Sequence, residues 1–362
     1  MKVVVIGAGV AGLGIGWRLA QTGAEVVVLE RAQPGRGATW ASAGMIAPAA
    51  ESGAAASSPD AKFSHYSSSL WPDFAAELEA ASGFQIGYRK SGSLICALSD
   101  QKAAELRGGP GQWLSAGEAL AMEPMLTPSI KGAAWLPEEA QVDNRALGRA
   151  LASAFMRAGG KLLPNEAVIR LEMDPSGVFA ARTPFAAHEG DAFVLAAGAW
   201  SGRIDGLPPH ALPAVRPVKG QMIALRPPKG APAPGPMLRE GHVYLVPRED
   251  RLLVGATVEE AGFDTGLTQE AEQELYDGAV ALLPDLERWP VCEHWAGLRP
   301  GSPDGLPILG RAAIGRLFVA TGQFRNGILF APAVAEALSA LVLGREPVAD
   351  IAAFDPRRFE RG

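Results

Sequence analysis

The sequence has 362 residues, of which 48% are hydrophobic and 20% are charged, which indicates a globular chain long enough for two domains. The 33 basic and 39 acidic residues give a net charge of −6, which disfavours nucleic acid as a partner. Two cysteines exclude a disulfide framework. No apolar run reaches the roughly 18 residues that a membrane span needs, so we expect a cytoplasmic protein without such a span.

The beginning of the chain predicts a strand, a glycine-rich turn, a helix and a second strand. Residues 3–6 and 25–29 are valine-rich runs, typical of strands buried on both faces. Between them, Gly7, Gly9 and Gly12 form a G-x-G-x-x-G motif, which permits a tight turn, the approach of a pyrophosphate and close helix packing. Glu30 follows the second run, where a carboxylate accepts hydrogen bonds from an adenosine ribose. The pattern predicts a Rossmann-type dinucleotide-binding domain.

Later runs predict two different sheets. Further strands of the parallel kind are expected over residues 191–196 and 316–320. Short runs separated by turn residues, typical of an antiparallel sheet, cover 221–225, 242–246 and 252–258. Helical periodicity covers 69–82, 144–158 and about 332–343. Because the two kinds of strand alternate along the chain, we expect an α/β fold, α+β overall, with a discontinuous antiparallel-sheet domain for the substrate.

Two segments are predicted to lie against the cofactor. Residues 33–59 are rich in Gly, Ala, Ser and Pro, and residues 36–45 within them suit a chain that lies along a phosphate and a flat ring. Residues 321–328 precede a predicted helix whose positive N-terminus would stabilise the negative charge of a reduced flavin. The residues alone leave both NAD and FAD open as the dinucleotide.

Taken in chain order, residues 7–12, 36–45, 196–200 and 295–310 resemble the D-amino-acid oxidase superfamily of FAD enzymes, and within it the glycine oxidases of thiamine biosynthesis. The resemblance covers essentially the whole chain. It implies an FAD-binding domain over 1–86, 141–217 and 296–362, and a substrate-binding domain over 87–140 and 218–295. It also implies oxidative deamination of glycine or a similarly small amino acid, oxygen as electron acceptor, hydrogen peroxide as product and a homotetramer.

The same resemblance assigns site residues. The substrate side comprises Arg299 as the carboxylate-binding arginine, Tyr244 as its partner and Arg325 near the flavin. His242 is added from strand alternation, because it lies two residues before Tyr244 and is expected on the same strand face. The adenine side includes Val168, within a predicted strand over 165–169. The full set of expected cofactor-binding residues is Gly7, Gly9, Val10, Gly12, Glu30, Arg31, Thr39, Ser42, Ala43, Gly44, Met45, Val168, Ala197, Gly198, Trp200, Arg299, Arg325, Asn326, Gly327, Ile328 and Leu329.

Some features leave alternatives open. Sarcosine oxidases of this superfamily attach flavin through a cysteine at a position that falls near Gly297 here, so noncovalent FAD is expected. Val258 stands where some glycine oxidases place a methionine, which leaves room for a D-amino-acid, sarcosine or D-proline-type oxidase or dehydrogenase. A flavin-binding electron carrier is an alternative of another class, and an NAD-dependent dehydrogenase a more distant one. The five histidines are scattered, so no metal site is expected.

Overall fold

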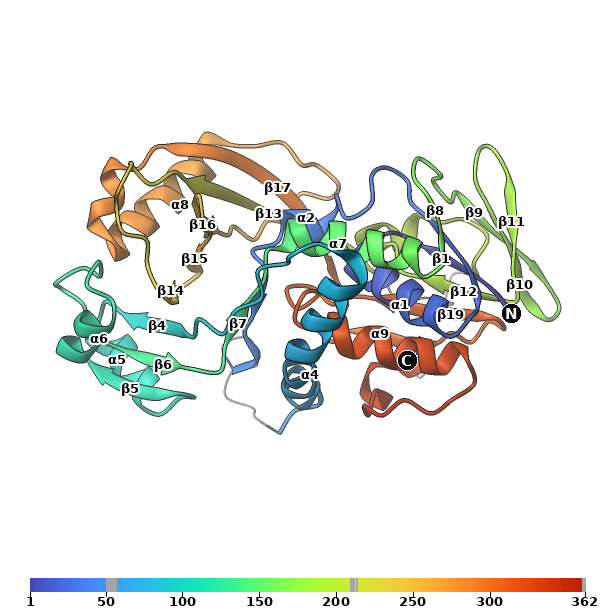
Figure 1. Cartoon of the computed structure of the whole chain (residues 1–362), viewed down its shortest axis with the longest axis horizontal. Helices are drawn as coiled ribbons and strands as arrows, with labels where there is room; N and C mark the ends of the chain where they lie inside the picture. Colours follow the sequence, from blue (N-terminus) through green and yellow to red (C-terminus); the bar gives the residue numbers. More distant parts are fainter. Residues whose placement is uncertain (50–56, 209–211, 213, 360–362) are drawn as a thin grey trace.

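The computed structural model describes residues 1–49, 57–208, 212 and 214–359. Two large sheets form two lobes, which Figure 1 shows side by side. The α/β fold class expected from the sequence is confirmed. Residues 50–56 of the predicted cofactor-enclosing segment 33–59 lie outside the described part.

The first lobe is built on a six-stranded sheet in the order β18-β19-β12-β1-β2-β8. All neighbours pair in parallel except β18, which is antiparallel to β19. The strands are β1 (Lys2–Ile6), β2 (Glu25–Leu29), β8 (Lys161–Leu163), β12 (Ala192–Leu195), β18 (Ile308–Arg311) and β19 (Leu317–Thr321).

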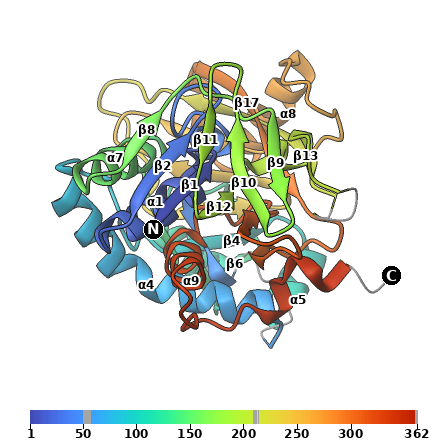
Figure 2. The same ribbon diagram turned by 90° about the vertical axis from the view of Figure 1, so that its right-hand side faces the viewer.

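Both faces of this sheet are covered, which explains the uninterrupted valine runs. Val3 and Val5 of β1 lie in a core formed with four helices, whereas Val4 and Ile6 pack against a three-stranded sheet on the other face. The helices are α1 (Val10–Gln21), α4 (Pro59–Ser82), α7 (Asn144–Arg157) and α9 (Ala331–Val342). The small sheet, seen in front of β1 in Figure 2, consists of β9 (Arg170–Asp174), β10 (Gly177–Arg182) and β11 (Ala187–Glu189).

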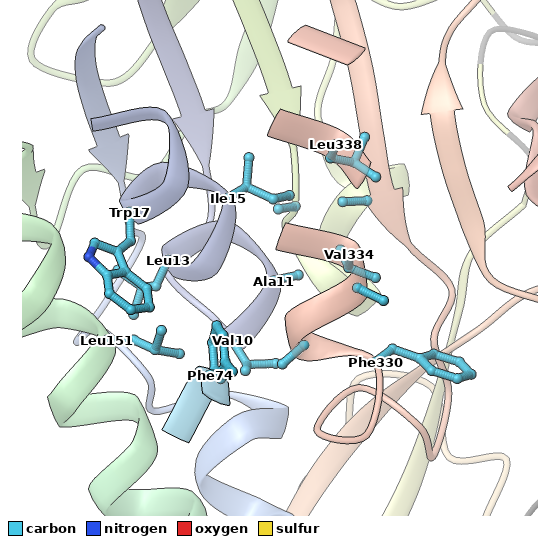
Figure 3. Packing of buried hydrophobic residues seen from close by; sticks show 14 of the residues in the cluster. Val10, Ala11, Leu13, Ile15, Trp17, Phe74, Leu151, Phe330, Val334 and Leu338 are labelled. Carbon is cyan, nitrogen blue, oxygen red and sulfur yellow. The ribbon is translucent and has the colours of Figure 1, made fainter. Parts of the chain in front are cut away.

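Helix α1 is buried along nearly its whole length between its neighbours. Figure 3 shows Ala11 and Ile15 on the side of α9, with Trp17 on the opposite side. Helix α4 begins ten residues before its predicted start, because Ser58 caps its N-terminus and Pro59 occupies the first turn. The serine–proline pair is a start signal that hydrophobic periodicity does not contain.

The second lobe is built on an eight-stranded sheet in the order β17-β13-β16-β15-β14-β4-β6-β5. Its strands are β4 (Ser93–Ala97), β5 (Gln112–Ser115), β6 (Gly132–Leu136), β13 (Arg216–Leu225), β14 (Met237–Glu240), β15 (Val243–Pro247), β16 (Leu252–Gly255) and β17 (Val291–Gly301). One face packs against α8 (Gln269–Leu282) and α6 (Ala116–Met122), with α5 (Asp100–Arg107) beside β4 and β6. The other face carries Met222, Tyr244 and Trp295 toward the first lobe.

The predicted domain bounds can be placed on these sheets. Every strand of the six-stranded sheet lies within the segments expected to bind FAD. Two bounds, 217/218 and 295/296, fall inside β13 and β17, because these long strands begin beside one lobe and continue into the other. The strand expected over 252–258 ends at Gly255, and residues 165–169 form no strand because Asn165 turns the chain at φ 60°.

Candidate active site

A cavity of about 430 Å³ lies between the carboxyl ends of the central parallel strands and the inner face of the eight-stranded sheet. Its wall contains Tyr244 and every residue predicted to bind the cofactor except Gly12. Residues far apart in the chain therefore meet at one place, where ligands bind in open parallel sheets.

The glycine motif forms the floor of one end of this cavity. Gly7 has φ 103°, and a Cβ atom on Gly12 would lie 1.9 Å from the Gly7 carbonyl oxygen, so Gly12 acts in packing beneath the wall. Helix α1 starts at Val10, whose N–H donates to Thr39 Oγ1 at 2.9 Å. The N-terminus of α1 lines the cavity through Gly9, Val10 and Ala11, as a pyrophosphate site requires.

Glu30 occupies the position at the end of β2 that the ribose of a dinucleotide needs. Its carboxylate accepts the N–H of Ala8 at 2.8 Å and the N–H of Ala32 at 3.0 Å, one on each oxygen. The guanidinium of Arg31 lies 3.5 Å from the centre of the Trp200 ring. Burial lowers the pKa of Arg31, although the charge of Glu30 opposes this shift.

The segment from Thr39 to Met45 is fixed by side chains that the sequence argument missed. Helix α2 (Ala38–Ala41) ends against Asn144 Nδ2, which donates to the carbonyl oxygens of Thr39 and Trp40 at 2.9 and 2.8 Å. Trp295 Nε1 donates to the Ala41 carbonyl oxygen at 3.0 Å. Since these contacts join residues more than 100 positions apart, no local sequence pattern predicts them.

Arg248 holds the same segment from the other side. Its guanidinium donates to the carbonyl oxygens of Ala43 and Val142 and to the side chain of Gln141. Burial lowers the pKa of Arg248 to about 10, partly offset by the charge of Asp143. Gly44, with φ 72°, lies against this guanidinium, so the backbone along the cavity is clamped in one conformation.

Arg299 and Tyr244 lie in the wall contributed by the eight-stranded sheet. Arg299 Nη1 donates to the Thr257 carbonyl oxygen at 3.0 Å and to the Lys219 carbonyl oxygen at 3.3 Å. A Cβ atom on Gly220 would lie 2.3 Å from both terminal nitrogens of Arg299, so the missing side chain at Gly220 makes room for the guanidinium. The Tyr244 hydroxyl lies 3.8 Å from Met222 Sδ.

His242 does not join this group, which corrects the expectation that it shares a face with Tyr244. It precedes β15 and follows Gly241, whose φ is 56°, so the two-residue alternation of the strand does not extend back to it. The imidazole is exposed and its Nε2 lies 2.8 Å from Glu274 Oε1 on α8. Val258 is also largely exposed and lies outside the cavity wall.

The wall after β19 is formed by residues 323–329. Arg325 is exposed at the rim, and α9 follows with Pro332 in its first turn. Within the part of the chain that the structure describes, Gln323 Nε2 is a buried donor without a hydrogen-bond partner. The N-terminus of α1, the carboxylate of Glu30 and the amide donor of Gln323 together fit FAD.

Neither Cys96 nor Cys292 lines the cavity. Gly297 does line it and lies close to Ala41. Noncovalent attachment of FAD therefore stays a prediction that agrees with the geometry. In the described residues, no helix is long and apolar enough to cross a bilayer. The same residues contain no group of three or more His, Cys, Asp or Glu side chains that could hold a metal ion.

Comparison with known proteins places this site in a family. The model of the family described as FAD-dependent oxidoreductase matches residues 2–341. A glycine oxidase from Geobacillus kaustophilus is 36% identical over 375 residues, covering 98% of this chain and 96% of the relative. A crystal structure of glycine oxidase from the same organism superposes with a TM-score of 0.92 and 34% identity, covering 99% of each chain.

A bifunctional protein ThiO/ThiG from Trichormus variabilis is 35% identical over 368 residues. The match covers 99% of this chain but 55% of the relative, so the chain spans about half the length of that protein. The family match and the full-length similarity to glycine oxidases agree with the cavity geometry. The chain therefore belongs to the FAD-dependent oxidoreductase family, and within that family to the glycine oxidases.

Proposed function

We propose that this chain catalyses the oxidative deamination of glycine, or of a similarly small amino acid, with bound FAD as oxidant and oxygen as electron acceptor. The observation that carries the proposal is the position of Arg299 and Tyr244 in the cavity wall that also holds the cofactor-binding residues. In the overall reaction the amino acid loses two electrons and two protons to form an imine, which water hydrolyses to a 2-oxo acid and ammonia. Oxygen takes up the two electrons and two protons and becomes hydrogen peroxide.

The side chains of this wall bind and orient the substrate. The planar guanidinium of Arg299 matches both oxygens of a carboxylate, and the Tyr244 hydroxyl donates a further hydrogen bond. Tyr244 and Met222 are 7% and 2% exposed, so the ion pair forms beside a poorly hydrated surface, where it is stronger than in water. Holding the carboxylate at Arg299 fixes the direction in which the α-carbon points.

The opposite part of the wall would hold the cofactor. Glu30 would accept the ribose hydroxyls, the N-terminus of α1 would bind the pyrophosphate, and the segment clamped by Arg248 would lie along the remainder. When bound there, FAD would supply the two-electron oxidation of the amine, with Arg299 and Tyr244 holding the substrate carboxylate. The resemblance to glycine oxidases further supports a role in thiamine biosynthesis and a homotetrameric assembly.

The experiment is an anaerobic flavin spectrum of the purified protein, recorded with glycine, sarcosine, D-alanine and D-proline. Glycine should reduce the flavin, and readmitted oxygen should restore it with formation of hydrogen peroxide. Arg299→Ala should lower kcat/KM for glycine roughly 30- to several-thousandfold, since truncating one partner of a buried charge pair costs about 2–5 kcal/mol. Arg299→Lys should remain impaired because the fork is lost. The exposed Arg107 of α5, changed to Ala, is the matched control.

The outcomes discriminate between the alternatives. Faster reduction by sarcosine, D-alanine or D-proline would assign another substrate of the same superfamily. A flavin that none of the four amines reduces would favour an electron carrier. A near-normal KM for glycine in Arg299→Ala would show that another residue binds the substrate carboxylate, with Arg325 at the rim as the first candidate.

A further inference from the structure

A polar network lies directly behind the wall that carries Arg299. It joins β13 to the segment 257–268, which we call the strap and which connects β16 to α8. Along β13, Gly220 and Met222 line the cavity. The alternating residues Lys219 and Gln221 form side-chain contacts with the strap instead.

Lys219 is the centre of this network and is only 2% exposed. Its Nζ lies 3.2 Å from Glu259 Oε2. The other oxygen of Glu259 accepts Gln221 Nε2 at 2.9 Å and the Thr257 hydroxyl at 2.5 Å. Burial would raise the pKa of Glu259, but the hydrogen bonds from Thr257, Gln221 and Lys219 outweigh it and lower the pKa, which keeps the carboxylate charged.

The backbone repeats the same connection. Lys219 and Glu259 exchange two N–H···O hydrogen bonds of 2.9 and 3.0 Å, and Thr257 N–H donates to the Gln221 carbonyl oxygen at 3.2 Å. Gln221 N–H donates in turn to Thr257 Oγ1 at 2.8 Å, and Gln221 Oε1 accepts the N–H of Thr268 at 2.9 Å. Both ends of the strap are therefore fastened to β13.

The network ends at the guanidinium of Arg299. Arg299 Nη1 donates to two carbonyl oxygens, one of Lys219 in β13 and one of Thr257 in the strap. A shift of the strap relative to β13 would separate these two acceptors. A buried ion pair is often no more stabilising than an apolar pair of the same size, so stability alone does not account for a buried lysine at this position.

We propose that the Lys219–Glu259 pair positions the guanidinium of Arg299. The pair thereby sets the affinity for the substrate carboxylate without touching the substrate itself. The proposal rests on the function proposed above, in which Arg299 binds that carboxylate. Its direct consequence is that changes at Lys219 or Glu259 should act on carboxylate binding through Arg299 and leave FAD retention intact.

The test is a double-mutant cycle. Lys219→Met and Glu259→Gln are each made in the wild type and in Arg299→Ala. The dissociation constant of acetate, a carboxylate without an amine, is measured from the flavin absorbance, alongside KM and kcat for glycine. Each single change should raise the dissociation constant of acetate and the KM for glycine roughly tenfold, with a smaller change in kcat. This size is expected because the interaction between coupled neighbours is typically about 0.5–3 kcal/mol, or about 2- to 150-fold. In the Arg299→Ala background neither change should lower the affinity for acetate further.

Controls separate positioning from folding. Lys90→Met removes an exposed ion pair with Glu138 and should leave all of these constants unchanged. If Lys219→Met is too unstable to retain FAD, Glu259→Gln provides the same comparison, since it keeps the size of the side chain. Unchanged acetate affinity in Glu259→Gln, or equal losses with and without Arg299, would overturn the positioning role. Unchanged acetate affinity in Arg299→Ala alone would instead overturn the carboxylate site itself.

Discussion

The substitution Gly220→Ala tests the carboxylate site without removing any functional group. The added Cβ would lie 2.3 Å from both terminal nitrogens of Arg299 and 2.5 Å from its Cζ. Ordinary contact requires at least 3.4 Å, so the guanidinium must move by about 1 Å. Because it is the end of a flexible side chain, the backbone can stay in place. A displacement of about 1 Å can cost about 100-fold in rate, so we expect kcat/KM for glycine to fall by roughly that factor.

The assay is hydrogen peroxide formation at varied glycine concentration, together with flavin content and the midpoint of thermal unfolding. Flavin content should stay near that of the wild type. Gly117→Ala is the matched control, because Gly117 is exposed on α6 and a Cβ there meets nothing within 4 Å. Unchanged kcat/KM in Gly220→Ala would refute the assignment of Arg299, since the clash cannot be avoided without moving it. Loss of flavin would show that the β13 wall supports the cofactor instead.

Three further outcomes are expected. Glu30→Ala should release FAD on dilution, measured by gel filtration, since each lost hydrogen bond to this charged acceptor is worth about 1.5–3 kcal/mol; retained flavin would assign Glu30 another role. Tyr244→Phe should raise KM for glycine roughly tenfold with flavin content unchanged, whereas loss of flavin would make the ring a packing element. Burial raises the pKa of the Cys96 thiol to about 12, so iodoacetamide at neutral pH should label the partly exposed Cys292 alone, as mass spectrometry of the native protein can show.

The parts of the fold that local chemistry determines were predictable from the sequence. The valine runs of β1 and β2 and the spacing of Gly7 to Gly12 need only neighbouring residues to act, and the structure places them as expected. The site residues Arg299 and Tyr244 came from resemblance. Their convergence depends on the pairing of β13 with β16 and β17, which no local pattern determines.

The features that escaped prediction have two physical origins. One is an interruption of periodicity: the turn at Gly241 separates His242 from the alternation that places Tyr244 in the cavity. The other is long-range contact. Asn144 and Arg248 hold backbone carbonyl groups more than 100 residues away, and the charge pair behind Arg299 joins Lys219 of β13 to Glu259 of the strap.

The long pairing of β13 with β17 bears on how the protein unfolds. The ladder runs from Arg216 opposite Gly301 to Leu225 opposite Val291, and both strands also contact the short helix at residues 198–203 of the first lobe. Because β13 and β17 form one side of the eight-stranded sheet and also contact this helix, unfolding of either lobe would break contacts that the two lobes share. We therefore expect the two lobes to unfold in a single transition despite their separate cores, and we expect a fragment that separates β13 from β17 to expose an unpaired strand prone to aggregation.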